Sequence, residues 1–398
     1  MTPKPATALE GRSSELIEID SAVVIPVFRP YLGPEVHAAT TAALNAGFLG
    51  LGSRTRDFEQ GIEAFLGAPD RHVVATSSCT EALQLSATLA GIGAGDEVIC
   101  PSFTYVAGHQ AMTATGAEVV FCDIEPDTLG LDAERAAELI GPRTRALMVM
   151  HMAGIPCRDT EAVYALAKER GLRVIEDAAH AFGSRTAAGP VGATGDLTCF
   201  SFGPVKLITT LEGGAVVTSK EEDVQVLHEL RLIGVNSDTE ARYRNTRTWH
   251  YDVMRQGYRS HLGSIPASIG SAQLALVDEF LANRQAYCRA YDDAFADIPE
   301  LTLLKTNWSD VGPFIYTVQC PDGESREGLM AHLKDVGVAS GIHFLGAHTF
   351  TYYKSSRKGE LPVTDQVSER IVTLPLHSYM SENTIRRVVA GVRSYFGR

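Results

Sequence analysis

Seven short apolar runs between residues 73 and 218 constrain the fold of this chain most strongly. They are VVAT (73–76), EVIC (97–100), VVFCD (119–123), ALMVM (146–150), RVIED (173–177), CFSF (199–202) and GAVVT (214–218). Runs rich in β-branched residues and without polar alternation are typical of strands buried on both faces. Amphipathic windows such as 80–93 and 159–171 lie between several of the runs and end on glycine, as helices often do. This alternation predicts an α/β fold with a mainly parallel sheet. The parallel order is expected to break at the last two runs, because no long helix joins them.

The sequence pattern changes after residue 257. A long helical window at 264–297 carries apolar residues at mixed three- and four-residue spacing, and mixed strand and helix patterns follow to the end. The apolar residues of this window are Ile265, Ile269, Leu274, Val277, Phe280 and Tyr287. We expect a loose N-terminal arm at 1–24, a large domain at 25–263 and a smaller α+β domain at 264–398, which the length of 398 residues allows.

Composition and cysteine usage narrow the classes of function. The chain has 35 Lys and Arg against 48 Asp and Glu, a net charge of −13, whereas wrapping DNA or coating an anionic membrane needs dense positive charge. Its seven cysteines are scattered and never form a CxxC pair, which indicates reduced thiols and no zinc site. The sequence shows no signal-peptide core and no apolar run long enough to span a membrane. We expect a cytoplasmic protein that binds neither nucleic acid, membrane nor metal.

Small hydroxyl residues follow the first run, where a helix is expected to open. Neither a P-loop nor a dinucleotide-binding glycine motif is present, and the segment reads Thr76, Ser77, Ser78, Cys79, Thr80. Backbone N–H groups and the positive end of the helix dipole make such a helix start suitable for a phosphate. An ordinary N-cap explains the same residues, so this feature alone leaves both interpretations open.

Two charged residues lie at or just after the carboxyl ends of runs that are expected to be buried strands. Asp177 ends RVIED, at the edge of the sheet where open α/β folds bind ligands, and it either caps the next turn or faces a ligand cation. Lys206 follows CFSF in a loop that ends in Gly213 and Gly214, and it is either a surface lysine or a desolvated amine with a lowered pKa. The two glycines favour the second interpretation, because they allow a close backbone approach. An amine, an anion and phosphate donors together meet the needs of pyridoxal 5′-phosphate (PLP).

Four stretches resemble the DegT/DnrJ/StrS family of sugar aminotransferases, which are fold-type-I PLP enzymes. These stretches are SSCTEAL (77–83), GIGAGDEVICPSFTYVA (91–107), EDAAHAFGS (176–184) and SFGPVKLITTLEGGAVVT (201–218), and the likeness runs from about residue 25 to 382. The resemblance implies that Lys206 forms a Schiff base with PLP and later moves a proton on the substrate. It also implies that Asp177 keeps the pyridine nitrogen protonated and that His180 lies near the phenolic oxygen.

The remaining cofactor contacts are also implied by the resemblance. Tyr105 takes the place of the aromatic residue that stacks on the ring. Backbone N–H groups of the Ser78, Cys79 and Thr80 segment and the Ser201 hydroxyl take the places that bind the phosphate.

Several residues depart from the family pattern. Cys79 and Leu211 replace glycines that are common in the family, and both changes look compatible with cofactor binding. Arg259 stands where many members have an Asn that reaches the cofactor phosphate of the neighbouring subunit, so Arg259 either makes this contact or faces solvent. Pro266 is expected to shorten the start of the following helix. HFLGAH (343–348) matches the family only loosely, which leaves a sugar contact by His343 or His348 open. Their five-residue separation could also suggest a metal site, but the sequence offers no carboxylate or Cys partner nearby, so we expect none.

The resemblance implies an aminotransferase that moves an amino group from an amino acid, with glutamate as the expected donor, to a nucleotide-linked keto-deoxysugar. Ping-pong kinetics and a homodimer with shared active sites are also implied. Sugar dehydratases of the same fold replace the lysine with histidine, so Lys206 argues against them, although a dehydrating branch that keeps the lysine is excluded less firmly. A non-catalytic binding homologue would be expected to lose Asp177 or Lys206.

Overall fold

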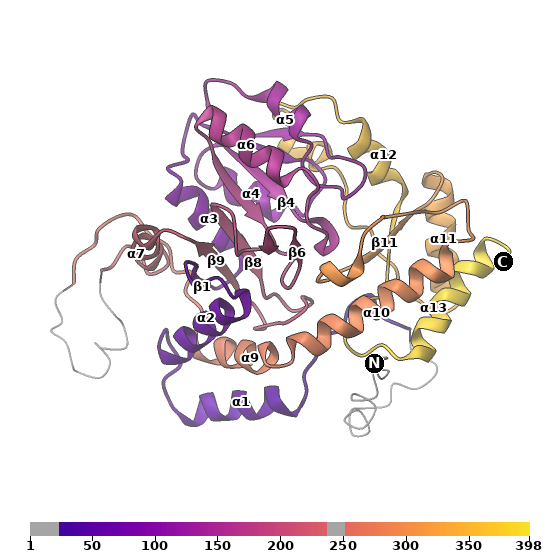
Figure 1. The fold of residues 1–398 in the computed structure, drawn as a ribbon, viewed down its shortest axis with the longest axis horizontal. Coiled ribbons are helices and arrows are strands. Elements are labelled where there is room, and N and C mark those ends of the chain that lie inside the picture. The colour runs from indigo at the N-terminus through magenta and orange to yellow at the C-terminus, as the bar shows by residue number, and fades with distance from the viewer. Residues whose placement is uncertain (1–23, 237–250) are drawn as a thin grey trace.

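The structure is a computed structural model, and it describes residues 24–236 and 251–398. The predicted N-terminal arm lies, apart from Val24, outside the described residues. A seven-stranded sheet forms the centre of the larger part of the molecule (Figure 1), in the order β1-β9-β8-β5-β4-β2-β3. Its strands are β1 (His72–Thr76), β2 (Glu97–Pro101), β3 (Glu118–Cys122), β4 (Thr144–Met150), β5 (Arg173–Asp177), β8 (Leu197–Ser201) and β9 (Gly214–Thr218). Each predicted run therefore coincides with one strand, and the α/β fold is confirmed.

The sheet is parallel except at β9, which is antiparallel to both β1 and β8. The expected break in the parallel order thus lies where no long helix joins two successive strands. The short hairpin of β6 (Arg185–Thr186) and β7 (Gly189–Pro190) lies in the loop between β5 and β8.

Helices cover both faces of the sheet, which explains the unbroken apolar runs. In β2, Val98 and Cys100 belong to one buried cluster and Ile99 to another, because successive side chains of a strand point to opposite faces. The first cluster includes residues of α3 (Cys79–Leu89), α4 (Ala107–Thr113) and α7 (Glu221–Leu230). On the other face lie α5 (Ala133–Leu139) and α6 (Thr160–Arg170), and further along α2 (Ser53–Leu66).

The predicted helical window at 264–297 consists of two helices. They are α9 (Ser264–Leu274) and α10 (Val277–Phe295), separated at residues 275–276. Pro266 does not shorten α9, contrary to expectation, because it lies in the first turn, where a backbone N–H has no partner within the helix. Since α9 packs against α1 (Pro34–Asn45) and α2 whereas α10 packs against α13 (Glu382–Tyr395), a domain division at residue 263 stays a prediction.

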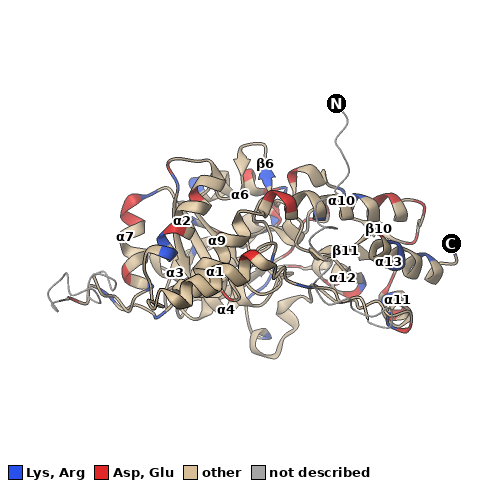
Figure 2. Ribbon diagram, turned by 90° about the horizontal axis from the view of Figure 1, so that it is seen from below, with Lys and Arg blue, Asp and Glu red and all other residues tan. Residues whose placement is uncertain are grey.

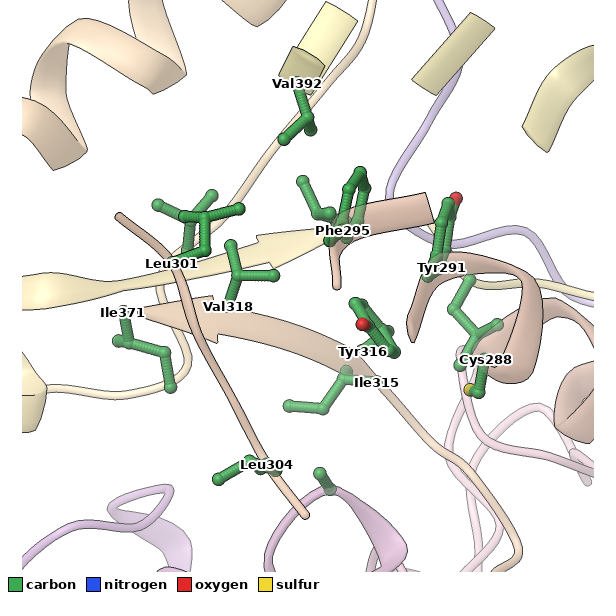
Figure 3. Packing of buried hydrophobic residues seen from close by; sticks show 14 of the residues in the cluster. Cys288, Tyr291, Phe295, Leu301, Leu304, Ile315, Tyr316, Val318, Ile371 and Val392 are labelled. Atoms are coloured by element: carbon green, nitrogen blue, oxygen red, sulfur yellow. The ribbon is translucent and has the colours of Figure 1, made fainter. Parts of the chain in front are cut away.

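The C-terminal part contains a three-stranded antiparallel sheet, β10 (Thr302–Leu303), β11 (Tyr316–Gln319) and β12 (Ile371–Leu374). The C-terminal part also contains the helices α10, α11 (Gly323–Asp335), α12 (Pro362–Arg370) and α13. Short 3₁₀ turns lie there at Trp308–Asp310, Ala347–Thr349 and Thr351–Tyr353, and another follows β4 at Met152–Gly154. Figure 3 shows its core, in which Tyr291 and Phe295 of α10 lie beside Tyr316 and Val318 of β11 and near Val392 of α13.

Charged residues of both signs are interspersed over the described elements (Figure 2), and the first turn of α7 is acidic. All seven cysteines are buried and unpaired. Within residues 24–236 and 251–398, no helix combines the length and apolar character that crossing a lipid bilayer requires.

Candidate active site

A cavity of about 370 Å³ opens at the carboxyl ends of the central strands. Its lining includes all the predicted site residues except Arg259: Ser78, Cys79, Thr80, Tyr105, Asp177, His180, Ser201 and Lys206. Parallel strands bring these residues together because their carboxyl ends meet at one edge of the sheet.

Asp177 ends β5 and is only 4 % exposed. Its Oδ1 accepts a hydrogen bond of 3.1 Å from the Ala179 N–H, so the carboxylate caps the following turn and also faces the cavity. Burial raises the pKa of Asp177, opposed by the Ala179 N–H and by the charges of Lys206 and His151. No described Lys, Arg or His forms an ion pair with it, so this buried carboxylate retains the capacity to bind a cationic group of a ligand.

A hydrogen-bond network behind Asp177 fixes the end of β5. The His151 N–H donates to the Asp177 carbonyl over 3.3 Å. His151 Nδ1 accepts from the Cys157 N–H at 3.0 Å, so Nε2 carries the proton and donates to Glu176 Oε2 at 2.9 Å. The Tyr164 hydroxyl also donates to Glu176. Sequence reasoning did not identify this network, since its members come from β5, from α6 and from the segment between β4 and α6.

Lys206 lies in the loop between β8 and β9 with its amine in the cavity. Its Nζ is 3.8 Å from the centroid of the Phe314 ring. Burial lowers the pKa of Lys206 to about 8, with Cys79 and Asp177 acting in the opposite direction and the charge of Arg284 in the same direction. An appreciable fraction of the amine is therefore neutral, and so nucleophilic, near neutral pH.

His180 follows β5 and is buried beside Lys206. Its ring centroid is 4.2 Å from that of Phe314 and 5.9 Å from that of Phe344. Burial, and then the charges of Lys206 and His343, hold the pKa of His180 well below its ordinary value. The imidazole is therefore neutral, and its buried Nδ1 has no hydrogen-bond partner among the described residues.

The N-terminus of α3 forms another wall of the cavity. Ser78 is the N-cap and accepts a 3.1 Å hydrogen bond from the Glu81 N–H, so the N-cap interpretation is correct. Cys79 and Thr80 follow in the first turn, where backbone N–H groups have no partner within the helix and remain suitable for an anion. The backbone at Gly213 and Gly214 was expected to approach another group closely, and that group is part of this chain. A side chain at Gly214 would overlap the backbone of Ser78 and Cys79.

Sequence reasoning missed an aromatic wall opposite the strand ends. It consists of Phe28, Phe314 and Phe344, and the predicted Tyr105, which is 59 % exposed, lies 5.7 Å from Phe344 between ring centroids. The three phenylalanines come from loops far apart in the sequence, so no local pattern marks them.

The structure separates the two histidines of HFLGAH. His343 lines the cavity, its Nδ1 lies 2.9 Å from the Thr373 hydroxyl, and burial together with the charge of Lys206 lowers its pKa to about 4. His348 instead contacts Ser102 at 2.8 Å and Asp365 at 3.2 Å.

Arg259 is exposed and outside the cavity. It pairs with Leu232 in an isolated backbone bridge and is not among the residues that line the cavity.

The model of the DegT/DnrJ/EryC1/StrS aminotransferase family matches residues 30–393. The chain belongs to this family. It is therefore a PLP-dependent aminotransferase of fold type I, and the predicted family, enzyme class and cofactor are confirmed.

Three solved structures are similar to this chain over almost its whole length. The aminotransferase TlmJ from Streptoalloteichus hindustanus is 33 % identical with a TM-score of 0.86, covering 94 % of this chain and 99 % of its own. DesV from S. venezuelae is 32 % identical with a TM-score of 0.83, covering 92 % and 95 %. Spr1654 from Streptococcus pneumoniae, solved in a PMP form, is 26 % identical with a TM-score of 0.87, covering 94 % and 99 %.

The residues of the cavity fit the PLP of this family. The amine of Lys206, the buried carboxylate of Asp177 and the open first turn of α3 would supply the covalent attachment point, the counter-ion and the phosphate donors that the cofactor needs. His180 offers a neutral ring whose Nδ1 lacks a partner among the described residues.

Proposed function

We propose that this enzyme transfers an amino group from L-glutamate to the ketone of a nucleotide-linked keto-deoxysugar, in two half-reactions at the same site. The observation that carries the proposal is that a lysine with a lowered pKa and a buried, unpaired carboxylate face one cavity. Similarity to CalS13 from Micromonospora echinospora, a sugar aminotransferase 29 % identical to this chain, supports a sugar acceptor.

Each residue has a role that its environment supports. PLP, when bound, supplies a carbonyl that captures the donor amine and a ring that delocalises the electron pair left by proton removal. Lys206 would remove the proton from the donor carbon and return it to the carbon on the other side of the transferred nitrogen, which requires an amine that is neutral part of the time. Asp177 holds a proton on the ring nitrogen, and a charge-assisted hydrogen bond there offsets the cost of its own burial. His180 donates or accepts at the phenolic oxygen as a neutral ring, and the aromatic wall excludes water.

The reaction is tested by separating its two halves. The enzyme is incubated with glutamate alone, freed of small molecules, and then given a panel of nucleotide-linked keto-deoxysugars and the corresponding free sugars. We expect 2-oxoglutarate in the first stage and an amino sugar, detected by mass spectrometry, only from the nucleotide-linked compounds in the second. Loss of water from a sugar without gain of nitrogen would favour the dehydrating branch instead.

We further propose that the enzyme is a homodimer in which a second copy completes each site. We place it in the cytoplasm, where the seven buried thiols stay reduced. Lys206 is the only Lys or Arg among the described residues that line the cavity, although the proposed substrates carry several negative charges. Arg259 lies on a surface segment that also exposes Ile233, Val253 and Met254, an apolar patch that a second copy would cover. We propose that Arg259 reaches the cofactor phosphate of the neighbouring subunit.

The shared site predicts complementation between two inactive variants. Lys206→Ala and Arg259→Ala homodimers are each expected to lose activity, whereas mixed dimers carry one site with both residues intact. If subunits reassort at random, about half of the dimers are mixed, and each mixed dimer has one intact site out of two. Mixing equal amounts should therefore restore up to roughly a quarter of the wild-type rate. Reassortment is verified by native mass spectrometry. Mixed dimers without activity would contradict the assignment of Arg259.

A further inference from the structure

Arg284 of α10 is a buried cation that the proposed mechanism does not use. It is 1 % exposed, and no carboxylate among the described residues pairs with it. Its Nη1 donates to the carbonyls of Pro313 and Phe314, at 3.2 Å each, and its Nε has no partner in the described part of the chain. Burial lowers the pKa of Arg284 to about 10. Burying a guanidinium without a carboxylate partner lowers the stability of the folded protein, so we expect Arg284 to have a role that compensates for this loss.

The segment that Arg284 contacts is also held by the larger part of the molecule. The Phe314 N–H donates to the Ala153 carbonyl at 3.0 Å, and the Gly312 N–H donates to Ser184 Oγ at 2.8 Å. A side chain at Gly312 would overlap the Phe182 carbonyl, so the two backbones pack without space between them. Hydrogen bonds from different directions therefore fix the backbone at both ends of residues 312–314.

This fixed segment places the Phe314 ring against two residues of the site. The ring centroid lies 3.8 Å from Lys206 Nζ and 4.2 Å from the His180 ring. Phe28 stacks on Phe314, with centroids 5.5 Å apart and ring planes at 9°. Phe314 thus supports the Lys206 amine from one direction and the imidazole from another, and a small displacement of its backbone would move both.

We propose that Arg284 is a positioning residue that acts through the carbonyls of Pro313 and Phe314 to hold the Phe314 ring against the Lys206 amine and the His180 ring. This inference rests on the proposed role of Lys206. Misplacement of a reacting group by about 1 Å can cost roughly 100-fold in rate, which gives a reason to keep a rigid polar anchor in an apolar core.

The charge of Arg284 supports the same role. Burial is the main cause of the lowered pKa of Lys206; Cys79 and Asp177 oppose it, and the charge of Arg284 acts in the same direction as burial. His180 and His343, which also face Lys206, have lowered pKa values and are neutral. Around Arg284 itself, Cys288 and Tyr287 favour its charged form. Burial lowers the pKa of the nearby His377, and the charges of Arg284 and Arg29 lower it further. Removing the guanidinium should therefore raise the pKa of Lys206.

The test measures Lys206 directly in the apoenzyme. Acetylation by a trace of acetic anhydride is quantified by mass spectrometry as a function of pH, and kcat and KM for glutamate are measured on the holoenzyme. In the wild type, labelling should have a midpoint near pH 8, and bound PLP should suppress it. Arg284→Met should shift the midpoint to higher pH and lower kcat by about tenfold, with little change in KM.

Three further variants separate positioning from a loss of stability. Arg284→Lys keeps the charge and can reach the carbonyls, so its midpoint should stay near the wild-type value and part of kcat should return. Phe314→Leu removes the ring but not the charge, so kcat should fall without an upward shift of the midpoint. Tyr291→Phe removes another buried donor, to the Pro375 carbonyl at 3.0 Å in the same core, and should change neither quantity.

Two outcomes would be decisive against the proposals. A wild-type midpoint and wild-type kcat in Arg284→Met would overturn the inference while leaving the function of Lys206 intact. An ordinary lysine midpoint in the wild-type enzyme, or labelling that PLP does not suppress, would contradict the proposed role of Lys206 and with it this inference.

Discussion

Replacing Lys206 with alanine is expected to lower the rate of amino transfer by more than about 10⁴-fold, because the variant lacks both the covalent attachment point for PLP and the group that moves the proton. Lys206 is the only lysine among the described residues that line the cavity, so no neighbouring amine can replace it there. The variant should also bind PLP without developing the yellow colour of the wild-type holoenzyme. The measurements are single-turnover formation of 2-oxoglutarate and the visible spectrum.

Lys220→Ala is the matched control for this prediction. Lys220 is half-exposed, pairs with Asp196 at 3.6 Å and lies beyond the far end of β9, so its loss should leave both the rate and the spectrum unchanged. A Lys206→Ala enzyme that retains more than about a hundredth of the wild-type rate would show that another group performs the proton transfer.

Asp177→Asn is expected to lower kcat by about 10²–10³-fold, because the neutral amide cannot hold a proton on the ring nitrogen. The side-chain oxygen of Asn can still accept the Ala179 N–H, so the turn after β5 should keep its geometry. The spectrum of the bound cofactor followed against pH reports the loss of this proton independently of turnover.

The same substitution has an opposite expected effect on stability. Burial raises the pKa of Asp177, so its charged form destabilises the folded apoprotein. This destabilisation is absent at pH values below the pKa that Asp177 has in the unfolded chain. It grows as the pH rises from there through the higher pKa that Asp177 has in the folded protein. At pH 7 the apoprotein of Asp177→Asn should therefore unfold at the same temperature as the wild type or higher, as is common where function imposes a cost on the fold.

Asp196→Asn is the control variant for both the kcat and the unfolding temperature of Asp177→Asn. Asp196 precedes β8 at the opposite edge of the sheet and pairs with Arg173, so its replacement should lower stability and leave kcat unchanged. An active Asp177→Asn enzyme, or one with a clearly lower unfolding temperature, would contradict the functional assignment of the carboxylate.

The sequence predicts the central sheet well, because a strand buried on both faces must be apolar at every position. Once β5 and β8 are recognised as neighbouring parallel strands, Asp177 and Ser201 must lie at the same edge, and Lys206 in the next loop is brought near them. The motif around Ser78 is placed by the same topology.

Other features depend on contacts that no local pattern encodes. Phe28, Phe314 and Phe344 line the cavity from loops far apart in the sequence, and Arg284 acts through backbone carbonyls that any residue would present. The division of the window at 264–297 into two helices was also missed, because the apolar spacing continues across residues 275–276. For Arg259 the sequence indicates only a position on the chain, and its proposed target lies on a second copy.

In the proposed reaction, one site takes nitrogen from an amino acid, holds it, and gives it to a sugar. The most direct measurement follows ¹⁵N from labelled glutamate through the enzyme after the glutamate and 2-oxoglutarate have been removed. We predict one ¹⁵N atom per active site in the amino sugar formed when a nucleotide-linked keto-deoxysugar is added, and none with Lys206→Ala. Product that forms only while glutamate is still present, or that lacks ¹⁵N, would contradict the account.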